Sequence, residues 1–365
     1  MSLPVTLSAD ALAVFSGDYE RARSGLLTRA KPCVLVEDRQ SFALNSADDD
    51  QAAALSTEIL WLGPRSAGKV LVLISATHGV EGFVGAAVQS DLLARLQQGY
   101  QLPDDTAVLL VFALNPYGFA KSRRCDEQGI DLNRNFIDFD QPLPDNRGYL
   151  ALQAAIYLED GIQRQQAFDR FRQAHGQTEF EVAISGGQYS DPQGPFYGGS
   201  GPAHGRRVIA QIIAHYQLAQ RHLAVVDIHS GLGRYAHGEV INDHPLASAG
   251  FRVASRWYGA SVTAPAMGTS SSVMKLGLMD YHWHALMGER GCFVTLEFGS
   301  YSTEALFEVI LQDHRCWKMG DAGAISNAAA AMREHFCPED SYWRELVLIK
   351  ARQVIQQAVD GLQHD

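Results

Sequence analysis

The sequence predicts an α/β fold built on a largely parallel sheet with helices on both faces. Short apolar runs rich in β-branched residues recur along the chain and favour buried strands. Long amphipathic stretches separate several of these runs. Strands that are apolar along their whole length and alternate with helices are typical of a sheet that is covered on both faces. Ligands of such sheets bind beyond the carboxyl ends of the strands.

The expected elements follow in chain order. A helix is predicted from residue 8 to about residue 28, with Ser8 as its N-cap. Strands are predicted at the apolar runs CVLVE (from 33), TEILWLG (57), KVLVLISA (69), TAVLLVFAL (106), HLAVVDI (222) and CFVTLEF (292). Further helices are predicted over residues 83–97, 149–173, 206–220, 303–314 and 342–362.

The chain is predicted to form a single domain over residues 1–365. It contains no internal repeat, low-complexity tract or linker-like change in composition. The motifs that carry chemistry fall within about residues 69–300, so residues 1–66 and 301–365 are expected to pack as extensions. The acidic run at residues 48–50 is expected to be a solvated loop.

Composition narrows the class of protein. A chain that is 46% hydrophobic and 19% charged is typical of a soluble enzyme, and a net charge of -11 argues against a nucleic-acid partner. No apolar run approaches the roughly 20 residues of a membrane helix. The N-terminus lacks a basic leader, and the five widely spaced cysteines indicate reduced thiols. We therefore expect a cytoplasmic protein without a membrane partner; no pattern indicates an oligomeric state.

Polar side chains stand at the ends of three predicted strands. His78 and Glu81 follow the run at 69, His229 ends the run at 222, and Glu297 lies near the end of the run at 292. If these strands are neighbours, the four side chains converge. Two histidines and one carboxylate form a typical catalytic zinc site, and a further carboxylate such as Glu297 can act as general base.

Each of these residues also has a simpler interpretation. His78 and Glu81 alone can simply close a turn, with Gly79 and Gly82 allowing the chain to bend tightly. His229 alone can bond to a turn backbone, and Asp227 can either orient it or cap the strand. Ser230 beside His229 suggests a serine hydrolase as an alternative, but the sequence contains no G-x-S-x-G elbow. G-x-G-x-x-G spacing, which a dinucleotide site requires, is also absent after His78.

A third motif lies in LNPYGFAKSRRCDEQGIDLNRNF, residues 114–136. Arg134 stands between Asn133 and Asn135 and is interpreted as a positioned guanidinium, whereas Lys121 and Arg123 are interpreted as solvated loop cations. Guanidinium groups bind carboxylates in a bidentate manner. A hydrolase that acts beside a free carboxyl group requires such a clamp.

Taken in the order in which they occur along the chain, these motifs resemble those of the zinc carboxypeptidase family, the carboxypeptidase A-like metallopeptidases, over about residues 69–300. The stretches DIHSGLG (from 227) and SGGQYSDPQGPFYGG (from 185) resemble a bacterial, poorly characterised branch of that family. The resemblance implies a mixed, mainly parallel sheet of about eight strands flanked by helices.

The resemblance also implies roles for individual residues. One zinc ion per chain would be bound by His78, Glu81 and His229, with Glu297 as the general base that activates a water molecule. An arginine of the Arg123–Arg124 pair, with Arg124 preferred, would stabilise the oxyanion. Asn133 and Arg134 would bind the substrate. A mobile tyrosine would also bind it; Tyr281 is the nearest candidate, and Tyr235 and Tyr258 remain open.

The expected function is therefore a zinc-dependent hydrolase of metallocarboxypeptidase type that cleaves an amide bond next to a free carboxylate. Its substrate would be a small peptide or an acyl-amino acid. One alternative keeps the metal and makes the protein an N-acyl-amino-acid deacylase. The other is a metal- or ligand-binding protein without turnover. The loop GTSSSVMKLG, residues 268–277, is expected to border the pocket.

Overall fold

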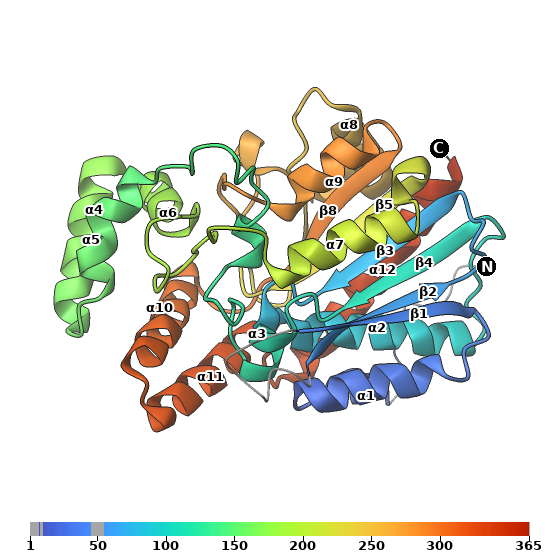
Figure 1. Cartoon of the computed structure of the whole chain (residues 1–365), viewed down its shortest axis with the longest axis horizontal. Coiled ribbons are helices and arrows are strands. Elements are labelled where there is room, and N and C mark those ends of the chain that lie inside the picture. The colour runs from blue at the N-terminus through green and yellow to red at the C-terminus, as the bar shows by residue number, and fades with distance from the viewer. Residues whose placement is uncertain (1–6, 8–9, 45–54, 365) are drawn as a thin grey trace.

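The computed structural model describes residue 7, residues 10–44 and residues 55–364, and this part of the chain forms one eight-stranded sheet (Figure 1). The strand order is β1-β2-β4-β3-β5-β8-β6-β7. The strands are β1 (Val36–Ala43), β2 (Ser56–Leu62), β3 (Lys69–Ser75), β4 (Thr106–Phe112), β5 (His222–Ser230), β6 (Gly238–Ile241), β7 (Val262–Thr263) and β8 (Gly291–Phe298).

The four central strands, β4, β3, β5 and β8, are parallel to one another. β1 and β2 extend the sheet in antiparallel fashion beyond β4, and at the other side β6 is antiparallel to β8 and parallel to β7. The central strands are buried almost throughout, because helices cover both of their faces. The predicted mixed, mainly parallel sheet of about eight strands is confirmed.

Helices pack on both faces of the sheet (Figure 1). One apolar core joins the sheet to α1, α2, α8 and α12, and a second core joins it to α7 and α9. α4, α5 and α6 lie together at one end of the molecule, near α10. The helices are α1 (Tyr19–Ala30), α2 (Gly82–Gln97), α3 (Pro116–Lys121), α4 (Arg147–Ile156), α5 (Gly161–His175), α6 (Gln177–Ser185), α7 (His204–His215), α8 (Ala249–Tyr258), α9 (Met279–Met287), α10 (Thr303–Met319), α11 (Ala322–Phe336) and α12 (Ser341–His364).

Two N-terminal predictions need correction. Helix α1 begins at Tyr19, because the Asp18 carboxylate accepts the backbone N–H of Arg21 at 2.8 Å and caps the helix there. Ser8, the predicted cap, lies outside the described residues, as does the acidic run at 48–50. The strand predicted from residue 33 begins only at Val36, and Val34 is 94% exposed.

The helix predicted over residues 149–173 is two helices, α4 and α5. The break falls before Asp160, whose carboxylate accepts the N–H of Ile162 at 2.8 Å and so starts a new helix. The short strands β6 and β7 were not predicted, since four and two residues are too few to show a period.

The segments that were predicted as extensions contribute to the same sheet and core. β1 and β2 are strands of the sheet, and α12 contacts α2, α8 and β5. In the described ranges, no helix is both long enough and apolar enough to cross a membrane.

Candidate metal centre and its cavity

The first two candidate ligands lie just beyond the end of β3. His78 precedes a short 3-10 turn, Gly79–Glu81, which leads directly into α2. Both ligand side chains are buried, with 4% of His78 and 2% of Glu81 exposed. The imidazole and the carboxylate are in contact, with His78 Nδ1 lying 2.9 Å from Glu81 Oε1.

The glycines of this turn allow close packing, and this differs from the tight bend expected of them. A Cβ atom on Gly79 would lie 2.1 Å from the carbonyl carbon of Gly118 in α3, and one on Gly82 would lie 2.5 Å from the ring of Phe119. Gly82 has an ordinary helical φ of -58°. The close approach also lets the Gly79 N–H donate to the carbonyl of Arg124 at 3.1 Å.

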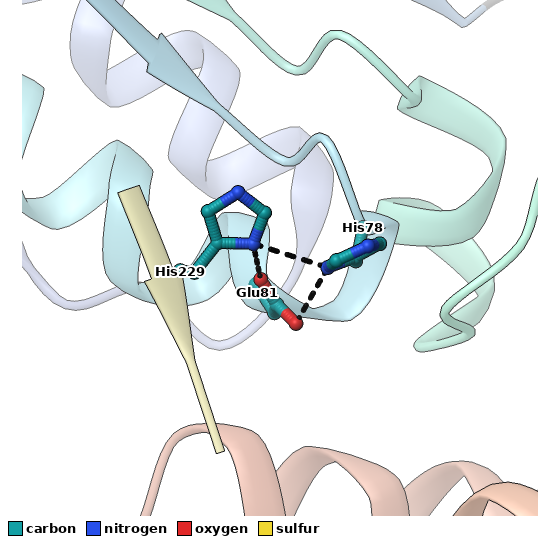
Figure 2. A group of neighbouring side chains, drawn as sticks. All are labelled: His78, Glu81 and His229. Carbon is teal, nitrogen blue, oxygen red and sulfur yellow. Dashed lines mark hydrogen bonds and ion pairs between the residues drawn. The ribbon is translucent and has the colours of Figure 1, made fainter. Parts of the chain in front are cut away.

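The third candidate ligand, His229, reaches the same point from β5 (Figure 2). Its Nδ1 atom lies 2.8 Å from Glu81 Oε2 and 3.1 Å from His78 Nδ1. The three side chains therefore present three ligand atoms to one small volume, and all three side chains are buried.

The spacing of these groups fits a zinc ion. Bonds of 2.0–2.1 Å in a tetrahedral site place ligand atoms about 3.3 Å apart. The two Nδ1 atoms lie 3.1 Å apart, and each lies 2.8–2.9 Å from one oxygen of the Glu81 carboxylate, Oε1 for His78 and Oε2 for His229. The buried Glu81 Oε2 makes no hydrogen bond among the described residues, and His229 Nδ1 lies 2.8 Å from it. When Nε2 of His229 carries the proton, this contact sets a carboxylate oxygen against a nitrogen lone pair, and a cation between them would relieve the repulsion.

Two further carboxylates hold the histidine rings in place. Asp227 Oδ2 lies 2.6 Å from His229 Nε2, and Thr77 donates to the other oxygen of Asp227 at 2.8 Å. Asp131 Oδ1 lies 3.3 Å from His78 Nε2. When Nε2–H of His229 donates to Asp227, the Nδ1 lone pair is directed at the ligand position. Of the two alternatives left open for Asp227, the geometry favours orientation of His229; the role of Asp131 was not predicted.

The electrostatics of the cluster favour a bound cation. Although burial opposes it, the carboxylates of Asp227 and Glu81 hold the pKa of His229 well above its ordinary value. Likewise against burial, the two imidazoles lower the pKa of Glu81 to about 2. The negative charge of the site therefore attracts a cation, either a proton or a metal ion.

Glu297 stands beside His229 in the β5–β8 ladder and lines the same cavity. Its Oε1 accepts the backbone N–H of Leu232 at 3.1 Å. Burial and the charge of Glu81 raise the pKa of Glu297 to about 8. A buried carboxyl group with a raised pKa, next to a candidate metal site, is suited to proton transfer.

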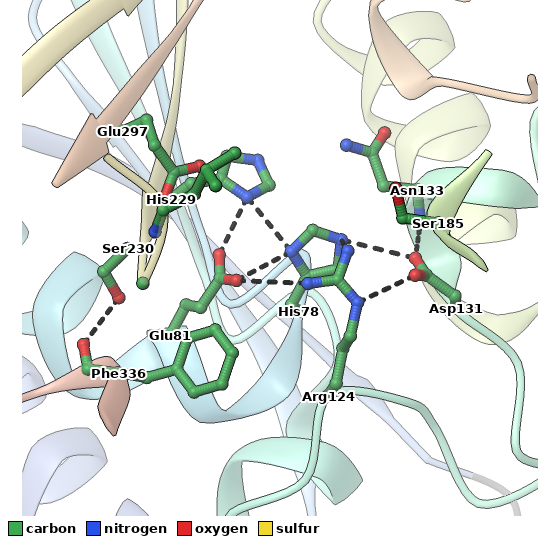
Figure 3. Close-up of polar contacts among 12 residues, drawn as sticks. His78, Glu81, Arg124, Asp131, Asn133, Ser185, His229, Ser230, Glu297 and Phe336 are labelled. Carbon is green, nitrogen blue, oxygen red and sulfur yellow. Dashed lines mark hydrogen bonds and ion pairs between the residues drawn. The ribbon is translucent and has the colours of Figure 1, made fainter. Parts of the chain in front are cut away.

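The structure separates the two neighbouring arginines. Arg124 donates through Nε to Asp131 at 2.8 Å, and its Nη2 lies 2.7 Å from His78 Nε2 (Figure 3). Arg123 instead donates to Asp313 of α10 at 2.9 Å and does not line the cavity. Only Arg124 reaches the candidate metal centre, and Arg123 is a buried ion-pair partner, not the solvated cation that was expected.

Arg134 and Asn133 line the cavity from the turn Leu132–Arg134. Arg134 is only 1% exposed and donates to the carbonyl groups of Ser185 and Asn133, with distances from 2.6 to 3.1 Å. These three bonds use three of its five N–H donors. The guanidinium carbon of Arg134 lies 5.7 Å from the ring centre of Phe196, and the guanidinium carbon of Arg124 lies 5.2 Å from the same ring centre.

The cavity and its open mouth together span about 870 Å³ that no protein atom fills. The segment 185–199 supplies Ser185 and Phe196 to its wall, and the loop 268–277 borders it as expected, through Ser271, Ser272, Val273 and Lys275. Tyr281 is not among the lining residues, and its hydroxyl donates to the Lys275 carbonyl at 3.3 Å. Asp243 and Asp280 line the cavity but were not expected there, because they belong to no recognised motif. Lys275 lies in the loop that was expected, although no role was assigned to it individually.

Replacing Asp227 by Asn should weaken zinc binding by about 10- to 100-fold, because His229 loses the carboxylate that orients it. Competition with a chromophoric chelator measures the affinity. Asp145→Asn, at an exposed site, is the control and should leave the affinity unchanged. An unaltered affinity in the Asp227 variant would contradict the assignment.

Replacing Gly79 by Ala should lower the free energy of unfolding by about 1–3 kcal/mol, because the new methyl group overlaps the backbone of α3. Gly201→Ala, where a Cβ meets nothing within 4 Å, should change it by less than about 0.5 kcal/mol. Denaturant unfolding checks both values, and equal stabilities for the two variants would count against close packing as the role of Gly79.

Comparison with solved structures finds similar folds. Carboxypeptidase A from Helicoverpa armigera, of the class that the motifs resemble, is 16% identical over 86% of this chain and 73% of that chain, with a TM-score of 0.48. Bovine thrombin-activatable fibrinolysis inhibitor, in complex with tick carboxypeptidase inhibitor, is 12% identical over 93% and 97%, with a TM-score of 0.46. Succinylglutamate desuccinylase from Chromobacterium violaceum is 14% identical over 89% and 75%, with a TM-score of 0.37.

No curated protein sequence matches the chain. Residues 15–350 match the model of a family described as "Protein of unknown function (DUF2817)". Since this match spans most of the sequence, the chain belongs to the DUF2817 family.

Proposed function

We propose that the protein is a zinc-dependent hydrolase of metallocarboxypeptidase type, which cleaves an amide bond next to a free carboxylate and in which residues 1–365 form one catalytic domain. One observation carries the proposal. A single cavity is lined by a His78–Glu81–His229 ligand set, by the buried carboxyl group of Glu297, and by Arg124 and Arg134. Hydrolysis of an amide requires a polarised carbonyl, a proton acceptor and a means of holding the substrate.

Zinc held by His78, Glu81 and His229 would lower the pKa of a water molecule and polarise the scissile carbonyl. Glu297 accepts the proton of the attacking water and passes it to the leaving amine as the C–N bond breaks. This step requires the carboxylate form of Glu297, which would be favoured by the positive charge of an ion held at the neighbouring ligands.

Arg124 and Arg134 have different roles in this mechanism. Arg124, held by Asp131 and next to His78, supports the negative charge that develops on the carbonyl oxygen. Arg134 binds the substrate carboxylate with its remaining donors, and Asn133 assists it. The Asn133 side-chain oxygen accepts the N–H of Met279 at 2.8 Å, which leaves the amide NH₂ group to donate.

The same groups suit an N-acyl-amino acid, whose amide bond also lies next to a carboxylate. One wall of the cavity is apolar, formed by Leu306, Phe307 and Ile310 of α10 and Phe336 of α11. This wall accommodates a hydrophobic acyl group as well as a peptide, so the deacylase is kept as the second candidate.

Chelation should abolish hydrolysis of both N-acyl-dipeptides and N-acyl-amino acids, and added zinc should restore it. Replacing Glu297 by Gln should retain zinc and lower kcat by about 10²- to 10⁴-fold, because the general base is lost. Metal analysis and steady-state kinetics measure the two effects. Glu304→Gln, at an exposed site on α10, is the control.

The relative kcat/KM for the two substrate types decides between peptidase and deacylase. Bound zinc without hydrolysis of either type would instead assign a binding protein without turnover. Hydrolysis that survives both chelation and Glu297→Gln would overturn the proposal.

Replacing Arg134 by Lys should lower kcat/KM for free-acid substrates by about 10- to 100-fold, because one ammonium cannot reproduce the planar guanidinium donors. Hydrolysis of the corresponding C-terminal amides should be much less affected. The matched control is Arg123→Lys, a buried arginine outside the cavity. An unchanged ratio of kcat/KM between the free-acid and the amide substrates would show that Arg134 does not bind the substrate carboxylate.

A further inference from the structure

A recess of the cavity extends from Glu297 along β8. Phe293, Thr295 and Glu297 alternate along this strand, so their side chains lie on one face of the sheet, and all three line the cavity. Ile241 of β6 pairs with Thr295 and continues the wall. Leu278 and Asp280, at the start of α9, also line the cavity.

Two carboxyl groups face this recess. Asp243 follows β6 by two residues, and Asp280 lies in the first turn of α9. Asp280 is 4% exposed, and its Oδ1 atom has no hydrogen-bond partner among the described residues. Burial and the nearby charge of Asp243 raise the pKa of Asp280 well above its ordinary value. A buried carboxyl oxygen that faces a cavity and accepts no hydrogen bond can accept one from a bound ligand.

The cations already present do not satisfy both carboxyl groups. Burial raises the pKa of Asp243, and the charge of Lys275 opposes the rise at both Asp243 and Asp280, but the ammonium group donates to the Ser272 hydroxyl. Arg134 also acts on Asp243 through its charge and is fixed by the carbonyl groups of Ser185 and Asn133. Neither bonds to Asp280 Oδ1, so that oxygen is available to a group brought by a ligand.

We propose that this recess binds a cationic side chain of the substrate, an ammonium or guanidinium group, between Asp243 and Asp280. The inference rests on the proposed hydrolase function and specifies its substrate class. Because Arg134 lies near Asp243, the residue whose carboxylate is held by Arg134 can place its side chain in the recess. The amino acid released would therefore be basic, similar to lysine or arginine.

Steady-state kinetics on benzoyl-glycyl-lysine and benzoyl-glycyl-norleucine test the inference, since norleucine is a neutral analogue of lysine of similar size. The wild type should favour the lysine substrate by at least about tenfold in kcat/KM, the scale expected of a hydrogen bond to a charged group. Asp280→Asn and, separately, Asp243→Asn should bring the ratio close to one, by losses on the lysine substrate alone.

Glu181→Gln serves as the charge-matched control, because Glu181 lines the cavity from α6. It should leave the lysine-to-norleucine ratio within about twofold. An equal ratio in the wild type, or a ratio unaffected by both aspartate variants, would overturn the inference while leaving the hydrolase proposal in place.

A binding measurement keeps the two proposals distinguishable. Calorimetry on the zinc-loaded Glu297→Gln protein should detect lysine binding at least about tenfold tighter than norleucine binding. Adding Asp280→Asn to this protein should remove the difference. If the wild-type protein binds lysine preferentially but hydrolyses neither substrate, the cation-binding role of the recess stands and the hydrolase proposal is refuted. If both amino acids bind equally, the cation-binding role of the recess is refuted.

Discussion

Three adjacent parallel strands, β3, β5 and β8, end at one edge of the sheet, and the candidate site depends on this shared end. β3 delivers the turn that carries His78 and Glu81, and the β5–β8 register places His229 beside Glu297. A slip of one residue in either ladder would direct these side chains to the opposite face. The apolar residues that fill both faces of the central strands make such a slip costly.

The charges explain how so many ionisable groups are tolerated in the interior. Each histidine ring contacts Glu81 on one side and an aspartate on the other. The aspartate is Asp131 for His78 (Figure 3) and Asp227 for His229. Carboxylates outnumber the imidazoles in this cluster, so the arrangement is stable only with added positive charge. Arg124 supplies part of that charge, and the converging ligand atoms provide a position for the rest.

Much of this arrangement could be predicted from the sequence, because continuous apolar strands and the polar residues at their ends are local patterns. Other features depend on contacts between distant segments. Arg123 and Arg124 are adjacent and chemically identical, and only the position of Asp313 in α10 distinguishes them. Asp280 belongs to no motif, and its significance comes from β6 and β8, which form the facing wall. The role of Gly79 likewise depends on the backbone of α3.

The packing of the ligand turn against α3 has a dynamic consequence. The N–H groups of Gly79 and Val80 donate to the carbonyls of Arg124 and Arg123, so the ligand turn and the arginine segment share one set of backbone hydrogen bonds. We expect segments that share backbone hydrogen bonds to open and close together as one local unit. A fluctuation that breaks these bonds should then displace both His78 and Arg124, and a ligand that orders one of them should slow amide hydrogen exchange in both.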